Sequence, residues 1–234
     1  MFGSLGFFGA VGVLVSMYAL VSFLKFAYET FLYRGDLSVY QTPTRDAWAL
    51  VTGVTSGIGE AFAHELASRG WNVLLVARSQ DKLSKVQADI AQKFPKVKTA
   101  IAVSDAGAAD VEKQVESVLT AARALPSNSL RLQVNNVGVS VDEPKLFLHT
   151  TPAEVVNICD VNCKYSTLLT LALLPLLRAA TGGKVGAANG AGRQRAAIIN
   201  LSSQSALFHV PYLAVYSASK VNKKRTRVRA VLAN

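Results

Sequence analysis

Two side chains with the types and spacing needed for proton transfer lie near the C-terminal end of the sequence. Tyr216 and Lys220 are four residues apart, so a helix places them one turn apart on the same face. A neighbouring ammonium favours the phenolate form of a tyrosine, which can exchange a proton with a carbonyl oxygen at neutral pH. Ser203 follows an apolar run before them, and its hydroxyl can hydrogen-bond the same oxygen. Tyr-x-x-x-Lys pairs are common by chance, so other motifs in the chain are needed to show whether this pair is catalytic.

A glycine-rich turn stands between a predicted strand, Trp48–Thr52, and a helix pattern that begins at Ile58. Gly53 allows a sharp turn because it has no Cβ. Gly57 and Gly59 let backbone N–H groups approach a pyrophosphate at the positive end of the helix. The spacing is Gly-x-x-x-Gly-x-Gly, not the better-known Gly-x-Gly-x-x-Gly. Taken alone, this triplet fits a phosphate cradle and an ordinary turn equally well.

The residues after the second and third predicted strands indicate which dinucleotide fits. An acidic residue after the second strand would bind ribose hydroxyls, but this chain has Arg78 and Ser79 there. A guanidinium and a hydroxyl suit a 2′-phosphate, so the sequence favours NADP(H) over NAD(H). The alternative is that Arg78 is simply solvated. Asp105 could accept a hydrogen bond from the adenine amino group or cap the next helix.

A polar pair, Asn135 and Asn136, stands with Gly138 at the end of the fourth predicted strand. Ligands of open parallel sheets bind in the crevice at the carboxyl ends of the strands, so these residues are candidates for the site. A simple turn explains them equally well.

Predicted strands and helices alternate from Ala47 onward. The expected strands are Trp48–Thr52, Asn72–Ala77, Val97–Val103, Arg131–Asn135 and Ala196–Leu201. The expected helices are Ile58–Ser68 (starting from the glycine turn), Ser79–Phe94 with Ser79 as N-cap, Ala108–Ala124, and Pro152–Ala180, with Pro175 kinking or ending the last; a surface loop follows over Thr181–Arg195, and another helix begins near Leu213. This alternation predicts the α/β class, with a Rossmann-like, doubly wound parallel sheet.

An uncharged stretch, residues 2–24, precedes this region and is long enough to cross a bilayer. A cleaved signal peptide is the alternative, but the basic n-region it would need is missing. Lys25, Arg34 and Arg45 follow the span, which places the rest of the chain in the cytosol by the positive-inside tendency. We therefore expect a transmembrane anchor over residues 1–25 and a juxtamembrane linker over 26–46.

The formal net charge is +10, from 25 basic and 15 acidic residues. Residues 220–229 hold six of the basic side chains and no acidic one, so without them the balance is 19 minus 15, or +4. The excess belongs to the tail, and nucleic acid is not the expected partner. Cys159 and Cys163 lack a metal-ligand pattern and are interpreted as buried thiols. His64, His149 and His209 are scattered, and we expect structural roles for them and no metal site.

Together these motifs resemble the short-chain dehydrogenase/reductase family over residues 47–220. The matching pieces are Thr52-Gly-x-x-x-Gly-Ile-Gly59, Asn135-Asn-Val-Gly138, Ser203, Tyr216 and Lys220, in the family's order. The resemblance implies that Tyr216 is the acid/base, that Lys220 favours its phenolate and holds the nicotinamide ribose, that Ser203 anchors the carbonyl, and that Asn162 supports a proton-relay water. The residues expected to bind cofactor are Gly53, Ser56, Gly57, Ile58, Gly59, Arg78, Asp105, Asn136, Gly138, Tyr216 and Lys220.

The chain is more closely similar to one branch of that family, the membrane-anchored very-long-chain 3-oxoacyl-CoA reductases and related 17β-hydroxysteroid dehydrogenases. The apolar anchor, the Asn-Asn-Val-Gly sequence and the Tyr216-Ser-Ala-Ser-Lys220 segment carry this similarity. It implies an endoplasmic-reticulum membrane protein that uses NADPH to reduce a 3-oxoacyl-CoA in fatty-acid elongation, with other elongation enzymes as partners. Reduction of a 17β-hydroxysteroid or another lipid ketone is the alternative.

The resemblance ends after Lys220, where the family expects a continuing amphipathic helix and further strands. Residues 221–234 form a basic, atypical tail, and Lys223, Lys224, Arg225 and Arg227 are not expected to form a buried helix face. The sequence therefore predicts either that the native protein is longer or that this is a truncated, inactive membrane-anchored form. Contact of the tail with anionic lipid is a third interpretation.

Overall fold

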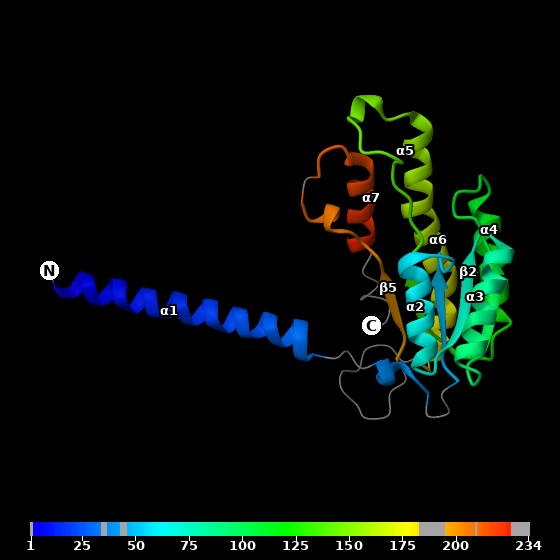
Figure 1. The fold of residues 1–234 in the computed structure, drawn as a ribbon, viewed down its shortest axis with the longest axis horizontal. Coiled ribbons are helices and arrows are strands. Elements are labelled where there is room, and N and C mark those ends of the chain that lie inside the picture. The colour runs from blue at the N-terminus through cyan, green and yellow to red at the C-terminus, as the bar shows by residue number, and fades with distance from the viewer. Residues whose placement is uncertain (1, 34–36, 43–45, 183–194, 209, 226–234) are drawn as a thin grey trace. The chain divides into compact units, whose positions relative to one another are not determined.

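The structure is a computed structural model that describes residues 2–33, 37–42, 46–182, 195–208 and 210–225 (Figure 1). The chain divides into two compact units, Met1–Ser38 and Val39–Asn234. The expectations for the loop around residue 190 and for the tail beyond residue 225 lie outside the described residues.

The first unit contains α1 (Phe2–Ala27), followed by a π-helical segment η1 (Tyr28–Leu32). Residues Phe8–Leu32 have a mean hydropathy of 1.9, and none of this span is buried inside the protein. By length and composition this is one apolar helix that could cross a membrane, which is compatible with an anchor. Helical structure continues beyond Lys25, so the first part of the expected linker is helical.

The second unit is built on a five-stranded sheet in which every pairing is parallel. The strands are β1 (Trp48–Thr52), β2 (Asn72–Ala77), β3 (Thr99–Val103), β4 (Leu130–Asn135) and β5 (Ala197–Asn200), in the order β3-β2-β1-β4-β5. β1 is flanked by β2 and β4, so the strand order reverses between β1 and β4, where such sheets bind ligands. The predicted doubly wound fold is confirmed.

Helices pack on both faces of the sheet (Figure 1). α2 (Gly57–Ser68) packs on β1 and β2, and the neighbouring α3 (Gln80–Lys93) packs on β2 and β3. α4 (Val111–Arg123) and α6 (Ser166–Ala180) pack together on the opposite face. Leu50, Leu74 and Leu169 are fully buried in the core on the α4 and α6 side. Continuous apolar strands buried on both faces are expected of such a layered sheet.

Side-chain caps set two helix starts. The Ser79 hydroxyl accepts a hydrogen bond from the Lys82 N–H, which confirms the predicted N-cap of α3. The Asp110 carboxylate accepts from the Lys113 N–H, so α4 begins at Val111 and not at Ala108 as expected. The helix therefore begins at the residue that follows its capping side chain, three residues after the expected start.

The long helix predicted over Pro152–Ala180 is three segments. A capping box between Thr151 and Glu154 starts α5 (Pro152–Cys159), a π-helical segment η4 (Asp160–Tyr165) follows, and α6 completes the run. Pro175 lies inside α6, which continues to Ala180, so the expectation that it ends the regular helix is wrong. Single π-turns inside helices occur frequently at functional sites.

The cysteines differ from their prediction as buried thiols. Cys159 is exposed and Cys163 is only partly buried, and both are free. Burial raises the pKa of the Cys163 thiol. His64 lies 3.2 Å from a carboxylate oxygen of Asp89, and no group of side chains that could hold a metal ion occurs among the described residues.

Candidate active site

The glycine turn after β1 is an open cradle at the start of α2. Gly53 and Gly57 have positive φ values of 70° and 58°, and a Cβ at Gly57 would meet nothing within 4 Å. Ser56 is the N-cap of α2, but its side chain makes no capping hydrogen bond, and the Ile58 side chain beside it is 64% exposed. The first N–H groups of α2 therefore face open space, as an incoming phosphate requires.

Gly59 and Asn136 join the cradle to the end of β4. The Asn136 amide donates to the carbonyls of Thr52 (2.9 Å) and Gly53 (3.1 Å). A Cβ on Gly59 would overlap both the Gly53 carbonyl and the Asn136 amide. Asn136 therefore fixes the shape of the cradle, and Gly59 allows the helix to approach it. Both were predicted as cofactor contacts, and both make structural contacts in this crevice.

Thr52 also takes part, although the sequence did not single it out as a site residue. Its hydroxyl accepts hydrogen bonds from the backbone N–H groups of Asn136 and Val137, each at 3.1 Å, and donates to the Val134 carbonyl. A buried hydroxyl at the end of a strand can therefore align the β1 and β4 ends. The sequence shows Thr52 before Gly53, but it does not show that β1 pairs with β4, and the role of the hydroxyl depends on that pairing.

Arg78 and Asp105 follow β2 and β3 at the same edge of the sheet. Arg78 is exposed directly after β2, beside the cap residue Ser79. Asp105 accepts a hydrogen bond from the Gly107 N–H at 3.0 Å. Since Asp110 caps α4, the alternative in which Asp105 caps that helix is wrong. An exposed guanidinium at this edge can receive a phosphate group.

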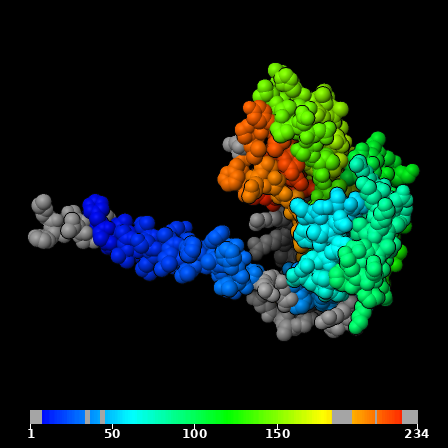
Figure 2. Space-filling model, viewed as in Figure 1, coloured from blue at the N-terminus to red at the C-terminus, as the bar shows by residue number. Residues whose placement is uncertain are grey.

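Tyr216 and Lys220 lie on α7 (Ala214–Arg225), which packs beside α5 and η4 (Figures 1 and 2). The Lys220 Nζ stands 5.4 Å from the centre of the Tyr216 ring and donates to the Leu201 carbonyl at 3.4 Å. Lys220 is only 5% exposed, and burial lowers the pKa of its ammonium. The predicted pair is therefore brought together and joined to the end of β5.

Asn162 is fully buried in η4 and reaches both the β4 end and α7. Its amide oxygen accepts from the Val139 N–H (2.8 Å), and its Nδ2 donates to the Val139 carbonyl and the Ser219 hydroxyl. The Ser219 hydroxyl donates in turn to the Tyr216 carbonyl at 2.7 Å. Asn162 and Lys220 flank Gly138, where a Cβ would lie 3.0 Å from an atom of each. Ser219, which the sequence did not single out, therefore links Asn162 to the backbone of Tyr216, and Gly138 brings Asn162 and Lys220 together.

Ser203 lies just after β5, in the segment whose residues hydrogen-bond to Lys220 of α7. The Ser202 hydroxyl donates to the Lys220 carbonyl at 2.8 Å, and the Ser203 hydroxyl accepts from the Ser205 N–H at 3.2 Å. Ser203 is partly buried and caps a short 3-10 turn, η5 (Gln204–Ala206). Its O–H remains a donor that can meet a carbonyl oxygen.

A buried polar network supports the segment that carries Asn162. The Thr170 hydroxyl accepts from the amides of Gln133 (3.1 Å) and Asn135 (3.0 Å) and donates to the Ser166 carbonyl. The Ser166 hydroxyl donates to the Asn162 carbonyl at 2.8 Å. The network therefore runs from β4 along α6 to the π-turn.

We expect Thr170→Val to lower the free energy of unfolding by about 1–3 kcal/mol, because two buried amides each lose one of their acceptors. Urea denaturation of the purified full chain in detergent measures this, with Thr170→Ser as the control that restores the hydroxyl. Equal stability of the valine variant and the wild type would show that the network contributes nothing.

The burial of Lys223 differs most from the prediction made from the sequence. Lys223 was not expected to form part of a buried helix face, yet it is 2% exposed and donates a hydrogen bond to the Val137 carbonyl. Burial, and then the neighbouring Lys220 ammonium, lower the pKa of Lys223 to about 7. A lysine can therefore occupy the buried face of this helix when a backbone carbonyl receives its ammonium.

We expect Lys223→Met to raise the free energy of unfolding near neutral pH by about 2 kcal/mol, because a buried cation costs free energy. The unfolded chain binds this proton with the usual pKa of 10.5 and the folded chain with a pKa of about 7. The unfolded chain binds more protons between these values, so wild-type stability rises with pH across that window. Urea denaturation at several pH values should show a shallower rise in the variant, and parallel profiles would contradict the expectation.

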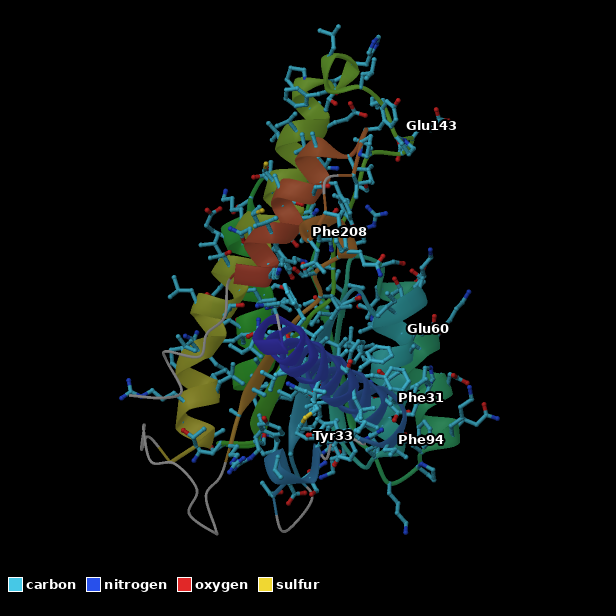
Figure 3. All side chains as sticks on the ribbon, turned by 90° about the vertical axis from the view of Figure 1, so that its left-hand side faces the viewer. Phe31, Tyr33, Glu60, Phe94, Glu143 and Phe208 are labelled. Carbon is cyan, nitrogen blue, oxygen red and sulfur yellow. The ribbon has the colours of Figure 1, made fainter. Side chains whose placement is uncertain are left out.

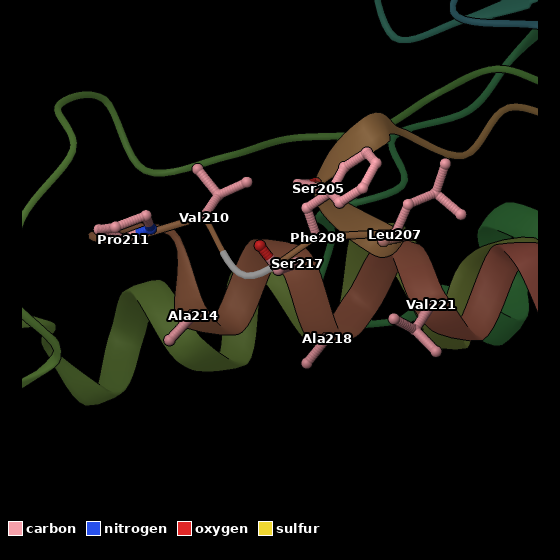
Figure 4. A pocket seen from close by; sticks show the side chains of 10 residues that line it. Ser205, Leu207, Phe208, Val210, Pro211, Ala214, Ser217, Ala218 and Val221 are labelled. Atoms are coloured by element: carbon pink, nitrogen blue, oxygen red, sulfur yellow. The ribbon is translucent and has the colours of Figure 1, made fainter.

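An apolar pocket of about 520 Å³ lies between α7 and the loop after β5 (Figure 4). Ala214, Ser217, Ala218 and Val221 line it at helical spacing. This spacing places them on the opposite face of α7 from Tyr216 and Lys220. Phe208, labelled in Figure 3, forms part of the other wall. The pocket is therefore separate from the candidate proton-transfer residues.

The doubly wound sheet, the glycine cradle at its strand reversal and the Tyr216–Lys220 pair define a nicotinamide-dinucleotide-binding domain. A sequence profile described as short chain dehydrogenase matches residues 47–224, and the chain belongs to that family of oxidoreductases.

The similar curated proteins include some named as reductases and some named as inactive. Very-long-chain 3-oxoacyl-CoA reductase of Bos taurus is 35% identical over 178 residues, which cover 76% of this chain and 51% of the relative. Inactive hydroxysteroid dehydrogenase-like protein 1 of Homo sapiens is 38% identical over 173 residues, covering 74% of this chain and 47% of the relative. The chain thus spans about half the length of these relatives.

Among solved structures, an alcohol dehydrogenase of Thermococcus sibiricus complexed with 5-hydroxy-NADP has a TM-score of 0.61 and 25% identity. The match covers 76% of this chain and 67% of that one. The fold and this neighbour support a nicotinamide cofactor.

Proposed function

We propose that this protein uses NADPH to reduce a very-long-chain 3-oxoacyl-CoA to the 3-hydroxyacyl-CoA, the reductive step of fatty-acid elongation. The observation that carries the proposal is that Asn162 and Lys220 meet at Gly138 and that Tyr216 lies beside Lys220, in a family whose curated relatives include very-long-chain 3-oxoacyl-CoA reductases. The apolar helix α1 is long enough to cross a membrane, which supports an anchor, and the proposal places that anchor in the endoplasmic-reticulum membrane with the reductase unit in the cytosol. Other elongation enzymes would then be its partners.

The side chains suit reduction of a ketone. When bound, NADPH supplies a hydride to the carbonyl carbon. Tyr216 donates its hydroxyl proton to the carbonyl oxygen, and the Ser203 hydroxyl orients that oxygen. Lys220 stabilises the phenolate that remains, because its ammonium stands over the ring. Asn162 holds the β4 end against α7, and a relay water bound there can return a proton to Tyr216.

The choice of NADPH over NADH rests on Arg78. The guanidinium is exposed directly after β2, at the same sheet edge as the open cradle of Gly57. A 2′-phosphate can accept hydrogen bonds from this guanidinium and is attracted by its positive charge, whereas a free ribose hydroxyl would favour an acidic residue at this position. Gly53, Ser56, Ile58 and the N–H groups that begin α2 would hold the pyrophosphate.

Two other functions compete with this one. Reduction of a 17β-hydroxysteroid ketone or another lipid ketone would use the same side chains. A catalytically inactive, membrane-anchored form is supported by the 38% identity to a relative named as inactive. Each predicts a different result in one assay.

The experiment is NADPH binding and oxidation by the full chain in lipid nanodiscs. The proposal predicts that NADPH binds and is consumed with a very-long-chain 3-oxoacyl-CoA, faster than with a steroid ketone. Faster turnover of the steroid ketone would favour the second function. NADPH binding without turnover of either substrate, or no binding at all, would establish the inactive form and rule out the reductase.

A further inference from the structure

A second buried ammonium stands beside Lys220. Lys223 follows it by three residues on α7, so a helix places the two side chains on neighbouring positions of one face. The Lys223 Nζ donates to the carbonyl of Val137, and the Lys220 Nζ lies 3.0 Å from where a Cβ of Gly138 would be. The two ammonium groups therefore lie at two consecutive residues of the segment that follows β4.

These ammonium groups lack a neutralising partner among the described residues. Neither Lys220 nor Lys223 makes an ion pair with any carboxylate of residues 37–42, 46–182, 195–208 and 210–225. The titratable groups that act on Lys223 are Lys220 on its own helix and the Cys163 thiol on η4, while the segment after β4 offers the Val137 carbonyl. The local field at this end of the crevice is therefore positive.

We propose that Lys223 makes the site discriminate between the two redox states of its cofactor, binding the reduced dinucleotide in preference to the oxidised one. Lys223 can act in this way only if the proposed function holds and a nicotinamide binds beside Tyr216. The oxidised nicotinamide ring carries a positive charge and the reduced ring is neutral, whereas the rest of the two dinucleotides is the same. A cation fixed nearby repels only the oxidised ring.

The size of the effect follows from Coulomb's law. For two unit charges on the order of 10 Å apart at an effective dielectric constant of about 20, repulsion changes affinity by roughly tenfold. Lys220 gives the site one such charge, and Lys223 adds a second. Release of the oxidised product becomes easier, so the additional lysine favours reduction over the reverse oxidation.

The experiment measures dissociation constants of NADPH and NADP⁺ by calorimetry, using the full chain in nanodiscs. Lys223→Met is expected to tighten NADP⁺ binding roughly tenfold relative to NADPH at about pH 6. Lys224→Met is the matched control, because it removes an equal charge from the adjacent, exposed position. It should leave the ratio of the two constants unchanged.

The pH dependence gives an independent measurement. The difference between wild type and Lys223→Met should be large at about pH 6 and nearly vanish at about pH 9, where Lys223 is neutral in the folded chain. Comparing the two proteins cancels the titration of the cofactor phosphate, which both share.

Three results separate this proposal from the reductase assignment. NADPH binding with the same NADP⁺ to NADPH ratio in wild type and both variants would overturn the role of Lys223 and leave the reductase intact. An equal change of the ratio in both variants would show that net charge alone causes it, and would also overturn the role of Lys223. Absence of any nicotinamide binding by the wild type would overturn both proposals together.

Discussion

Tyr216→Phe is expected to lower kcat for ketone reduction by about 10²- to 10⁴-fold, the usual contribution of a positioned acid/base group. The substitution removes only the hydroxyl, so the ring keeps its place beneath the Lys220 ammonium. The bond from Ser219 to residue 216 is unaffected, because it ends on a backbone carbonyl. Stopped-flow measurement of NADPH oxidation under single-turnover conditions would isolate the chemical step.

Binding should change much less than chemistry in this variant. The NADPH dissociation constant is expected to stay within about threefold of wild type, since the proton donor acts on the substrate. Tyr212→Phe is a matched control, because Tyr212 is exposed on the loop before α7. Turnover by Tyr216→Phe at the wild-type rate would show that another group supplies the proton, and the role assigned to Tyr216 would be wrong.

The sequence predicted the sheet well because its strands are unambiguous. β1 and β2 have the expected bounds, since every residue of each is buried and the apolar runs end at glycine or charged residues. β3 starts at Thr99 and not at Val97, and it is less buried because it is an edge strand. Apolar runs locate strands most accurately where both faces and both neighbours are covered.

The arrangement around Asn162 could not be predicted from local pattern. A π-turn has no distinct periodicity over so few residues, so Asp160–Tyr165 looked like ordinary helix. Lys223 was misjudged for a similar reason. Its burial depends on the Val137 carbonyl, which is distant in sequence, and a cluster of basic residues ordinarily indicates a solvated surface.

Gly59→Ala is expected to have the largest structural effect, lowering the free energy of unfolding by about 3 kcal/mol or more. The new Cβ would lie within 3.0 Å of the Gly53 carbonyl and the Asn136 amide, a separation that real Cβ atoms essentially never show. The carbonyl belongs to the backbone and cannot rotate away, so α2 must shift from β1. NADPH binding should be lost together with stability.

Gly57→Ala provides the comparison that separates packing from cofactor binding. A Cβ there meets nothing within 4 Å, so the cost is only the positive φ of 58°, about 1–2 kcal/mol. The methyl group nevertheless enters the open cradle, so NADPH affinity should fall at least tenfold while the fold persists. Urea denaturation and NADPH calorimetry on both variants test this. If Gly57→Ala bound NADPH as tightly as wild type, the cradle would not be the pyrophosphate site, whereas a stable Gly59→Ala would show that α2 can move away from β1 without loss.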